Sequence, residues 1–337
     1  MAPDVVPEAT PDPAPTPELL AWLLDSDPAL RWQVERDLVG APPEVWEATR
    51  ARVATEGYGA RLLAHQDPDG QWAGGAYFPG DFDPRGPEGA ADAGQPWTAT
   101  TWSMTALREW GLDASALAGT AERLAVSSRW EYDDLPYWAG EVDACINAWT
   151  LANGAWLGAD VSDLAQWFVD HRLADGGWNC QWVAGSERSS FHSTLNAVKG
   201  ILAYEVVTGR GGDLRDARHA GEEYLLERRL LHRRSTGELV GPWATRLGYP
   251  YRWVYSVINA LDHFRAAALH DGLAPDPRLA DAIQVLRSRR RPDGTWLQER
   301  RHPGRVWFEV DAPEGEPSKW LTFHGARILA WWDGATD

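Results

Sequence analysis

The chain has 337 residues, of which 44% are hydrophobic, so it is long enough to bury a large core in one or two domains. Its net charge of −17 argues against nucleic acid or an anionic membrane surface as a general partner, and no apolar run approaches the ~20 residues that a membrane span needs. Two cysteines imply no disulfide framework and no secretion signal is visible, so we predict a reduced, cytoplasmic setting.

The chain divides into three parts. Residues 1–17 are Pro-rich and acidic, cannot bury apolar surface, and are predicted to be a disordered tail. Residues 18–56 carry apolar positions at helical spacing behind Pro and Asp, which predicts N-terminal helices packed on the rest of the chain. Residues 57–337 form the predicted main domain.

A repeated unit organises this main domain. Each unit reads as a helix, a turn with Gly and Trp, and a second, apolar helix, and the second helices are expected to start near positions 97, 143, 191, 252 and 319. The clearest turns are Gln-Asp-Pro-Asp-Gly-Gln-Trp at 66–72, Asp-Gly-Gly-Trp at 175–178 and Asp-Gly-Thr-Trp at 293–296. The longest loops fall at 79–96 and 298–318.

No segment alternates apolar and polar residues with period two, so we predict no major strand. Helix pairs repeated about five to six times predict an all-α fold, an α/α toroid in which inner helices line a cavity and outer helices shield them. An open solenoid is the alternative.

Three residue types that zinc binds stand at the starts of two predicted inner helices. Asp143 and Cys145 open one helix, and His192 opens the next. Three protein ligands with an open fourth position are typical of a catalytic zinc site, and a thiolate at a helix N-terminus is stabilised by the helix dipole. Each residue also has an ordinary interpretation, namely a helix N-cap, a small buried residue and a hydrogen-bonded histidine. Cys180, in a turn of the same unit, is predicted to be structural.

The three turns resemble the Gln–Trp repeat of squalene cyclases and the Gly-Gly-aromatic repeat of protein prenyltransferase β subunits, families that share an α/α toroid. Val-Asp-Ala-Cys at 142–145 and Phe-His-Ser at 191–193 are similar to the zinc motifs of the prenyltransferase β subunits. The resemblance implies Asp143, Cys145 and His192 as zinc ligands, an isoprenoid-like apolar substrate and a possible partner subunit.

The chain departs from this pattern in its cations. The prenyltransferases carry Arg and Lys just before Asp-x-Cys, to hold a diphosphate, whereas residues 135–141 contain no base. Arg252 and Lys319, at the expected starts of the next two inner helices, are the predicted substitutes. Aromatic residues at inner-helix positions are predicted to line the apolar cavity, with core packing as their ordinary interpretation: Trp97, Trp102, Trp149, Trp253, Tyr255, Trp320 and Phe323.

These observations predict a zinc-dependent, prenyltransferase-like enzyme in which the metal activates a thiol or another nucleophile. Two alternatives stay open. Residues 141–144 resemble a degraded Asp-x-Asp-Asp motif of class II terpene cyclases, with Asp143 as the general acid. In the second alternative, the chain is a non-catalytic toroid that binds an apolar ligand or a protein.

Overall fold

The computed structural model describes residues 14–90 and 92–334 of the chain. As predicted, this part is mostly helical, and its one sheet is an antiparallel pair of two-residue strands, β1 (Trp296–Leu297) and β2 (Pro317–Ser318). The tail predicted to be disordered falls mainly on residues 1–13, which lie outside the described residues. No helix in the described ranges has the length and the apolar character that crossing a membrane requires.

Three short helices open the described chain, and a proline at the first position of each explains where they begin. Proline holds φ near its helical value. It also lacks a backbone N–H, and this costs nothing in the first turn because N–H groups there have no partner within the helix. The side chains of Thr16 and Asp27 cap the first two helices by accepting a backbone N–H. The three are α1 (Pro17–Leu24), α2 (Pro28–Val34) and α3 (Pro43–Ala51).

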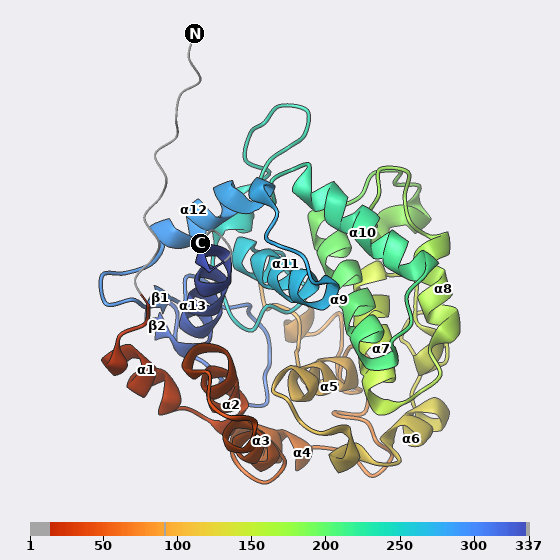
Figure 1. The fold of residues 1–337 in the computed structure, drawn as a ribbon. Helices are drawn as coiled ribbons and strands as arrows, with labels where there is room; N and C mark the ends of the chain where they lie inside the picture. Colours follow the sequence, from red (N-terminus) through yellow and green to blue (C-terminus); the bar gives the residue numbers. More distant parts are fainter. Residues whose placement is uncertain (1–13, 91, 335–337) are drawn as a thin grey trace.

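Two kinds of helix alternate from there to the C-terminus. The first kind comprises α4 (Gly57–Leu63), α6 (Thr120–Ser127), α8 (Ser162–Asp170), α10 (Asp213–Leu226) and α12 (Ala280–Ser288). The second kind comprises α5 (Thr100–Glu109), α7 (Ala144–Leu157), α9 (Phe191–Thr208), α11 (Val257–Asp271) and α13 (Lys319–Asp333). Figure 1 shows these elements following one another around the molecule, with α13 near α1 and α2.

Burial distinguishes the two kinds. Every residue of α7 from Ala144 to Ala155 is buried, and most of α9 and α13 is buried too. By contrast, α8 and α12 each bury a single face. A helix that is apolar all round belongs in an interior. Consecutive helices of the second kind contact each other from α5 to α13, so these are the inner helices and the first kind are outer helices.

The repeated turn connects an outer helix to an inner one through a buried tryptophan. The indole N–H donates to the carbonyl ten residues earlier, near the end of the preceding outer helix, at 2.9 Å for Trp72, 3.0 Å for Trp178 and 2.9 Å for Trp296. The backbone N–H of each tryptophan donates at 3.1 Å to a threonine hydroxyl on the following inner helix: Thr100, Thr194 and Thr322. The three turns predicted to be equivalent therefore make the same two hydrogen bonds.

The start of α11 differs from the prediction. The inner helix expected from position 252 begins at Val257, after Ser256 caps it by accepting the N–H of Asn259. Arg252 has a left-handed backbone, with φ of 53°, which ends any helical run at that point. Arg252, Trp253 and Tyr255 therefore belong to an irregular segment before the helix.

The tryptophan turn makes a prediction about stability. Thr194→Val keeps the shape of a fully buried side chain but removes the acceptor of the Trp178 N–H. We expect a loss of about 1–3 kcal/mol in the free energy of unfolding, because a buried donor loses its partner. Denaturant unfolding measures this. The same substitution at the exposed Thr55 is the control and should change stability by less than about 0.5 kcal/mol. Equal effects at the two sites would contradict the role given to the turn.

Candidate functional site

A cavity of about 80 Å³ lies between inner helices and the irregular segments that precede α11 and α13. Its aromatic lining, which defines the aromatic cavity, consists of Trp97, Trp102, Trp110, Trp149, Tyr249, Tyr251, Trp307 and Phe308. The Trp102 ring lies 4.7 Å from Trp97 and 4.6 Å from Trp149, measured between centroids. Contacting rings of this kind present an apolar surface that attracts cations and flat apolar groups.

Two cations in this lining, Arg252 and Lys199, form no ion pair with a described carboxylate. The Arg252 guanidinium lies 4.8 Å from the centroid of the Trp97 ring. Within residues 14–90 and 92–334 no carboxylate forms an ion pair with it, and burial lowers the pKa of Arg252 to about 10. A left-handed backbone costs a non-glycine residue energy and is found disproportionately at functional sites. Arg252 is thus an unpaired cation held at the wall of an apolar cavity.

Other basic groups lie in the same wall. His302 lines the cavity, and burial together with Arg300 and Arg252 lowers its pKa to about 4, so it is neutral near pH 7. Arg301 also lines the cavity but pairs with Glu309. Arg252 is therefore the lining cation to which the described residues give neither an ion pair nor a hydrogen bond, whereas Lys199 donates to Asn259.

Residues 298–316, the covering segment, close one side of the aromatic cavity and supply seven of its lining residues. Trp97 holds this segment twice, since its indole donates to the Pro303 carbonyl at 2.8 Å and its backbone N–H donates to the Arg305 carbonyl at 2.7 Å. The Trp307 indole donates to the Thr98 carbonyl at 3.1 Å. The sequence reasoning missed these lining residues, although the unusual length of this loop and its Trp, Phe, Arg and His content were a usable signal.

A second hollow of about 350 Å³, the apolar groove, adjoins the aromatic cavity. Its apolar side includes Trp156, Leu202, Val206 and Val207. The two spaces share the lining residues Glu109, Lys199, Tyr249 and Tyr251. The Lys199 amino group donates to Asn259 at 2.7 Å, and burial lowers its pKa. The wall that the two spaces share therefore carries an amino group, a carboxyl group and two phenols.

The structure separates the predicted substrate-binding residues into two sets. Trp97, Trp102, Trp149 and Arg252 line the aromatic cavity. The others lie elsewhere: Trp253 donates to Gln95, Tyr255 donates to the Leu230 carbonyl, Trp320 lines the apolar groove, and Phe323 is fully buried. Lys319 opens α13 as predicted, but its amino group contacts the Asp25 carbonyl and the Trp22 ring, away from the aromatic cavity.

The predicted metal residues Asp143 and Cys145 meet a second cysteine at the start of α7. Asp143 occupies the N-cap position, but its side chain makes no capping hydrogen bond. Burial raises the pKa of Asp143, and the neighbouring Cys180 thiol offsets part of this rise. The sulfur atoms of Cys145 and Cys180 are 3.5 Å apart. Cys180, predicted to be structural, is therefore part of this cluster.

The His192 side chain is hydrogen-bonded to the backbone of Tyr255 and does not converge with Asp143 and Cys145. Its Nδ1 accepts the backbone N–H of Tyr255 at 2.9 Å, so the neutral ring carries its proton on Nε2. Burial lowers the pKa of His192 to about 4, which keeps it neutral. Both ring nitrogens are thus occupied, one by the hydrogen bond and one by the proton. As placed, His192 offers no lone pair to a zinc ion.

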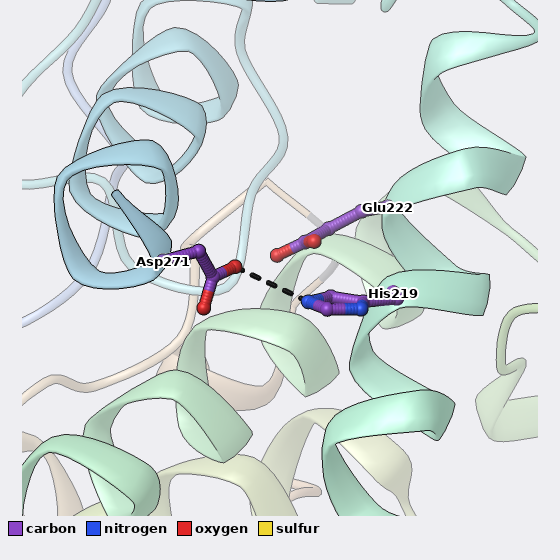
Figure 2. Close-up of side chains that lie close together, drawn as sticks. All are labelled: His219, Glu222 and Asp271. Atoms are coloured by element: carbon purple, nitrogen blue, oxygen red, sulfur yellow. Dashed lines mark hydrogen bonds and ion pairs between the residues drawn. The ribbon is translucent and has the colours of Figure 1, made fainter. Parts of the chain in front are cut away.

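Among the described residues, three ligand atoms come within 4.8 Å of one another at His219, Glu222 and Asp271, and not at Asp143, Cys145 and His192. Figure 2 shows His219 and Glu222, from α10, facing Asp271 at the end of α11. Arg218 already neutralises these acids, with nitrogens 2.8 Å from Glu222, 2.9 Å from Asp271 and 2.9 Å from Glu205. Its side chain is fully buried. The Arg218 guanidinium already supplies the positive charge that a metal ion would bring to these carboxylates, so this cluster is an ion-pair network.

Comparison with known proteins adds little to this geometry. No protein-family model matches the chain, and no curated protein matches it. A search of solved structures finds the crystal structure of a protein from Actinoplanes, with 16% identity over 93% of this chain and 91% of that chain, and a TM-score of 0.42. This likeness is too weak to carry an argument about function, so the proposals below rest on the residues of this chain.

The Arg218 network makes a prediction that depends on pH. Burial alone would raise the pKa of Glu222 and of Asp271. The hydrogen bonds and charges of His263 and Arg218 outweigh burial and lower the pKa of Glu222. Those of Arg218 and His219 do the same for the pKa of Asp271. Arg218→Met leaves buried carboxylates without their counter-charge and should cost on the order of 3–5 kcal/mol of unfolding free energy near pH 7.

The sign of the pH effect follows from these lowered values. Depressed carboxyl pKa values stabilise the wild type above the unfolded pKa of about 4, and this stabilisation disappears as pH falls through the folded values. The difference between wild type and variant should therefore shrink below about pH 4, as measured by denaturant unfolding across pH. Arg52→Met, at an exposed ion pair with Glu56, is the control and should leave stability nearly unchanged across the pH range. A pH-independent difference for Arg218→Met would refute the network.

Proposed function

We propose that the chain is an α/α toroid whose aromatic cavity binds an apolar, isoprenoid-like molecule that carries an anionic group. The observation that carries this proposal is the unpaired Arg252 guanidinium at the wall of a cavity built from aromatic rings. An apolar ligand chain would pack on the rings, and the planar guanidinium suits a carboxylate or a phosphate.

The order of the inner helices supports the toroid. Each inner helix contacts the next from α5 to α13. The last one returns to the N-terminal helices, because Arg327 on α13 pairs with Asp37 in the helical turn η1 (Glu35–Val39) at 3.0 Å. Such a succession is expected when paired helices close into a ring rather than extend as a solenoid.

The size of the cavity bears on how a ligand would enter. Binding pockets for small molecules usually have volumes of about 300–1,000 Å³. The aromatic cavity, at about 80 Å³, is smaller, and the covering segment forms one of its walls. We therefore expect ligand entry to displace the covering segment, which is held by the indole hydrogen bonds of Trp97 and Trp307 and by the ion pairs of Arg305 with Asp81 and Glu88.

Binding is better supported than catalysis. Asp143, the acid of the cyclase alternative, has a raised pKa but lies at the start of α7 and is not among the residues that line the aromatic cavity. Protonation of a ligand by Asp143 would need that ligand to extend beyond this cavity. An enzymatic activity and a partner subunit therefore stay predictions from the sequence.

A zinc-dependent transferase is the second candidate, favoured by the approach of the Cys145 and Cys180 sulfurs to 3.5 Å at the helix start where Asp143 is the N-cap residue. Two thiolates bound to one tetrahedral zinc at ~2.3 Å would lie about 3.8 Å apart, close to the observed sulfur separation. The full predicted set does not fit as placed, since His192 is bonded to Tyr255 and does not converge with the other two. We therefore derive no catalytic step through the metal.

The Arg252 proposal can be tested with a matched pair of ligands. Geranyl diphosphate and geraniol share an apolar chain, and only the first carries an anion. We expect the diphosphate to bind more tightly, measured by titration calorimetry. Arg252→Gln should weaken its binding by about tenfold to hundredfold, since a hydrogen bond to a charged group contributes ~1.5–3 kcal/mol. Geraniol binding should be unchanged in this variant.

Arg234→Gln, at an exposed ion pair with Glu227, is the control and should bind both ligands as the wild type does. Equal affinity of the wild type for the two ligands, or an Arg252 variant that keeps its preference for the diphosphate, would reject the proposal.

The zinc candidate has its own measurement. Protein purified from zinc-supplemented cells should contain about one zinc per chain by elemental analysis, and Cys145→Ser and Cys180→Ser should each lose it. His219→Ala, in the Arg218 network, is the control and should keep the metal. A wild type without zinc would remove this candidate and leave ligand binding as the proposed function.

A further inference from the structure

The two cysteines of the chain lie close together, although they belong to different elements. Cys145 stands in the first turn of α7, and Cys180 opens the helical turn η6 (Cys180–Ala184) 35 residues later. Their sulfurs are 3.5 Å apart. Both are free thiols; Cys145 is buried, at 7% exposure, whereas Cys180 is partly exposed. The pair therefore joins a partly exposed cysteine to a buried one.

Backbone and side-chain contacts hold this arrangement from both sides. The Trp182 indole donates to the Val142 carbonyl at 2.7 Å, which joins η6 to the residues just before α7. The Cys180 N–H donates to the Ser193 hydroxyl at 3.1 Å, which joins η6 to the first turn of α9. The Ser193 hydroxyl also lies 3.3 Å from the Cys180 sulfur, as a donor to it. The two sulfurs are thus kept close by groups outside the pair.

The distance suits a covalent bond after a small movement. A disulfide places its sulfurs about 2.05 Å apart, so they would have to approach by roughly 1.5 Å, a displacement that rotation of the side chains supplies. We propose that Cys145 and Cys180 form a reversible dithiol–disulfide pair, in which Cys180 reacts first with a low-molecular-weight disulfide and Cys145 then closes the intramolecular bond. This modification site is independent of the ligand proposed for the aromatic cavity.

The reaction balances in two exchanges. The Cys180 thiolate attacks one sulfur of the small disulfide, so a mixed disulfide forms and one small thiolate leaves. The Cys145 sulfur then attacks the Cys180 sulfur, the bond to the remaining small thiol breaks, and that thiol leaves with the Cys145 proton. The two cysteines are oxidised by two electrons in total, and the small disulfide is reduced to two thiols.

The order of attack follows from exposure. An incoming disulfide reaches the partly exposed Cys180 but not the buried Cys145. Once the mixed disulfide has formed, Cys145 is already beside the sulfur that it must attack. We therefore expect the mixed disulfide to be short-lived in the wild type.

The test uses the full chain, reduced, kept with a chelator so that the zinc candidate has no influence, and then exposed to glutathione disulfide. In the wild type we expect both thiols to disappear under native conditions, without accumulation of a glutathione adduct. Peptide mapping should identify a Cys145–Cys180 crosslink that dithiothreitol reverses. This measurement needs no substitution, so it does not depend on how a variant folds.

Two serine variants test the order of attack. Cys145→Ser should stop at a stable glutathione adduct on Cys180, and Cys180→Ser should react about tenfold more slowly or not at all, because the remaining thiol is buried. Circular dichroism should show that both variants stay folded. Free thiols that persist in the native wild type, a stable adduct without a crosslink, or equal reactivity of the two variants would each overturn the proposal.

Discussion

The hydrogen bonds of the three turn tryptophans are the constraint on which the rest of the structure depends. Each indole supplies a donor to a carbonyl near the end of an outer helix, and each backbone N–H is accepted by a threonine of the next inner helix. Polar groups in a packed interior need such partners, and the large ring fills the space between the helices at the same time. The direction in which α5, α9 and α13 leave their turns is thereby set, and the aromatic cavity forms beside the inner helices.

Buried arginines occur in the described structure both with and without a carboxylate partner. Arg218 and Arg327 are buried beside carboxylates that neutralise them, from α9, α10 and α11 in one case and from η1 and α11 in the other. Such pairs tie helices together, and removing one partner is costly. Arg252 is different, since its guanidinium faces aromatic rings and no described carboxylate pairs with it. This contrast singles out the aromatic cavity as a place for an anion.

The start of α7 brings together groups with more than one chemical possibility. Asp143 stands at the N-cap position without capping the helix, and burial raises the pKa of its carboxyl group. Two sulfurs at 3.5 Å suit either a shared soft metal or a disulfide. The histidine that would complete a metal site accepts a backbone N–H from the segment before α11 instead. The geometry therefore supports the sulfur pair more directly than the metal centre.

Local sequence patterns determined the helices, the three equivalent turns and the chemistry of the residues at the start of α7, because helical periodicity, capping and glycine conformations act over a few neighbouring residues. They also placed Trp97, Trp102 and Trp149 on a cavity wall. Only the tertiary structure decided that Arg252 precedes its helix, that the covering segment completes the cavity, and that Cys180 meets Cys145. It likewise turned His192 toward Tyr255, 63 residues later. These outcomes depend on contacts between segments that are distant in the chain, and no local pattern encodes which of them will pack together.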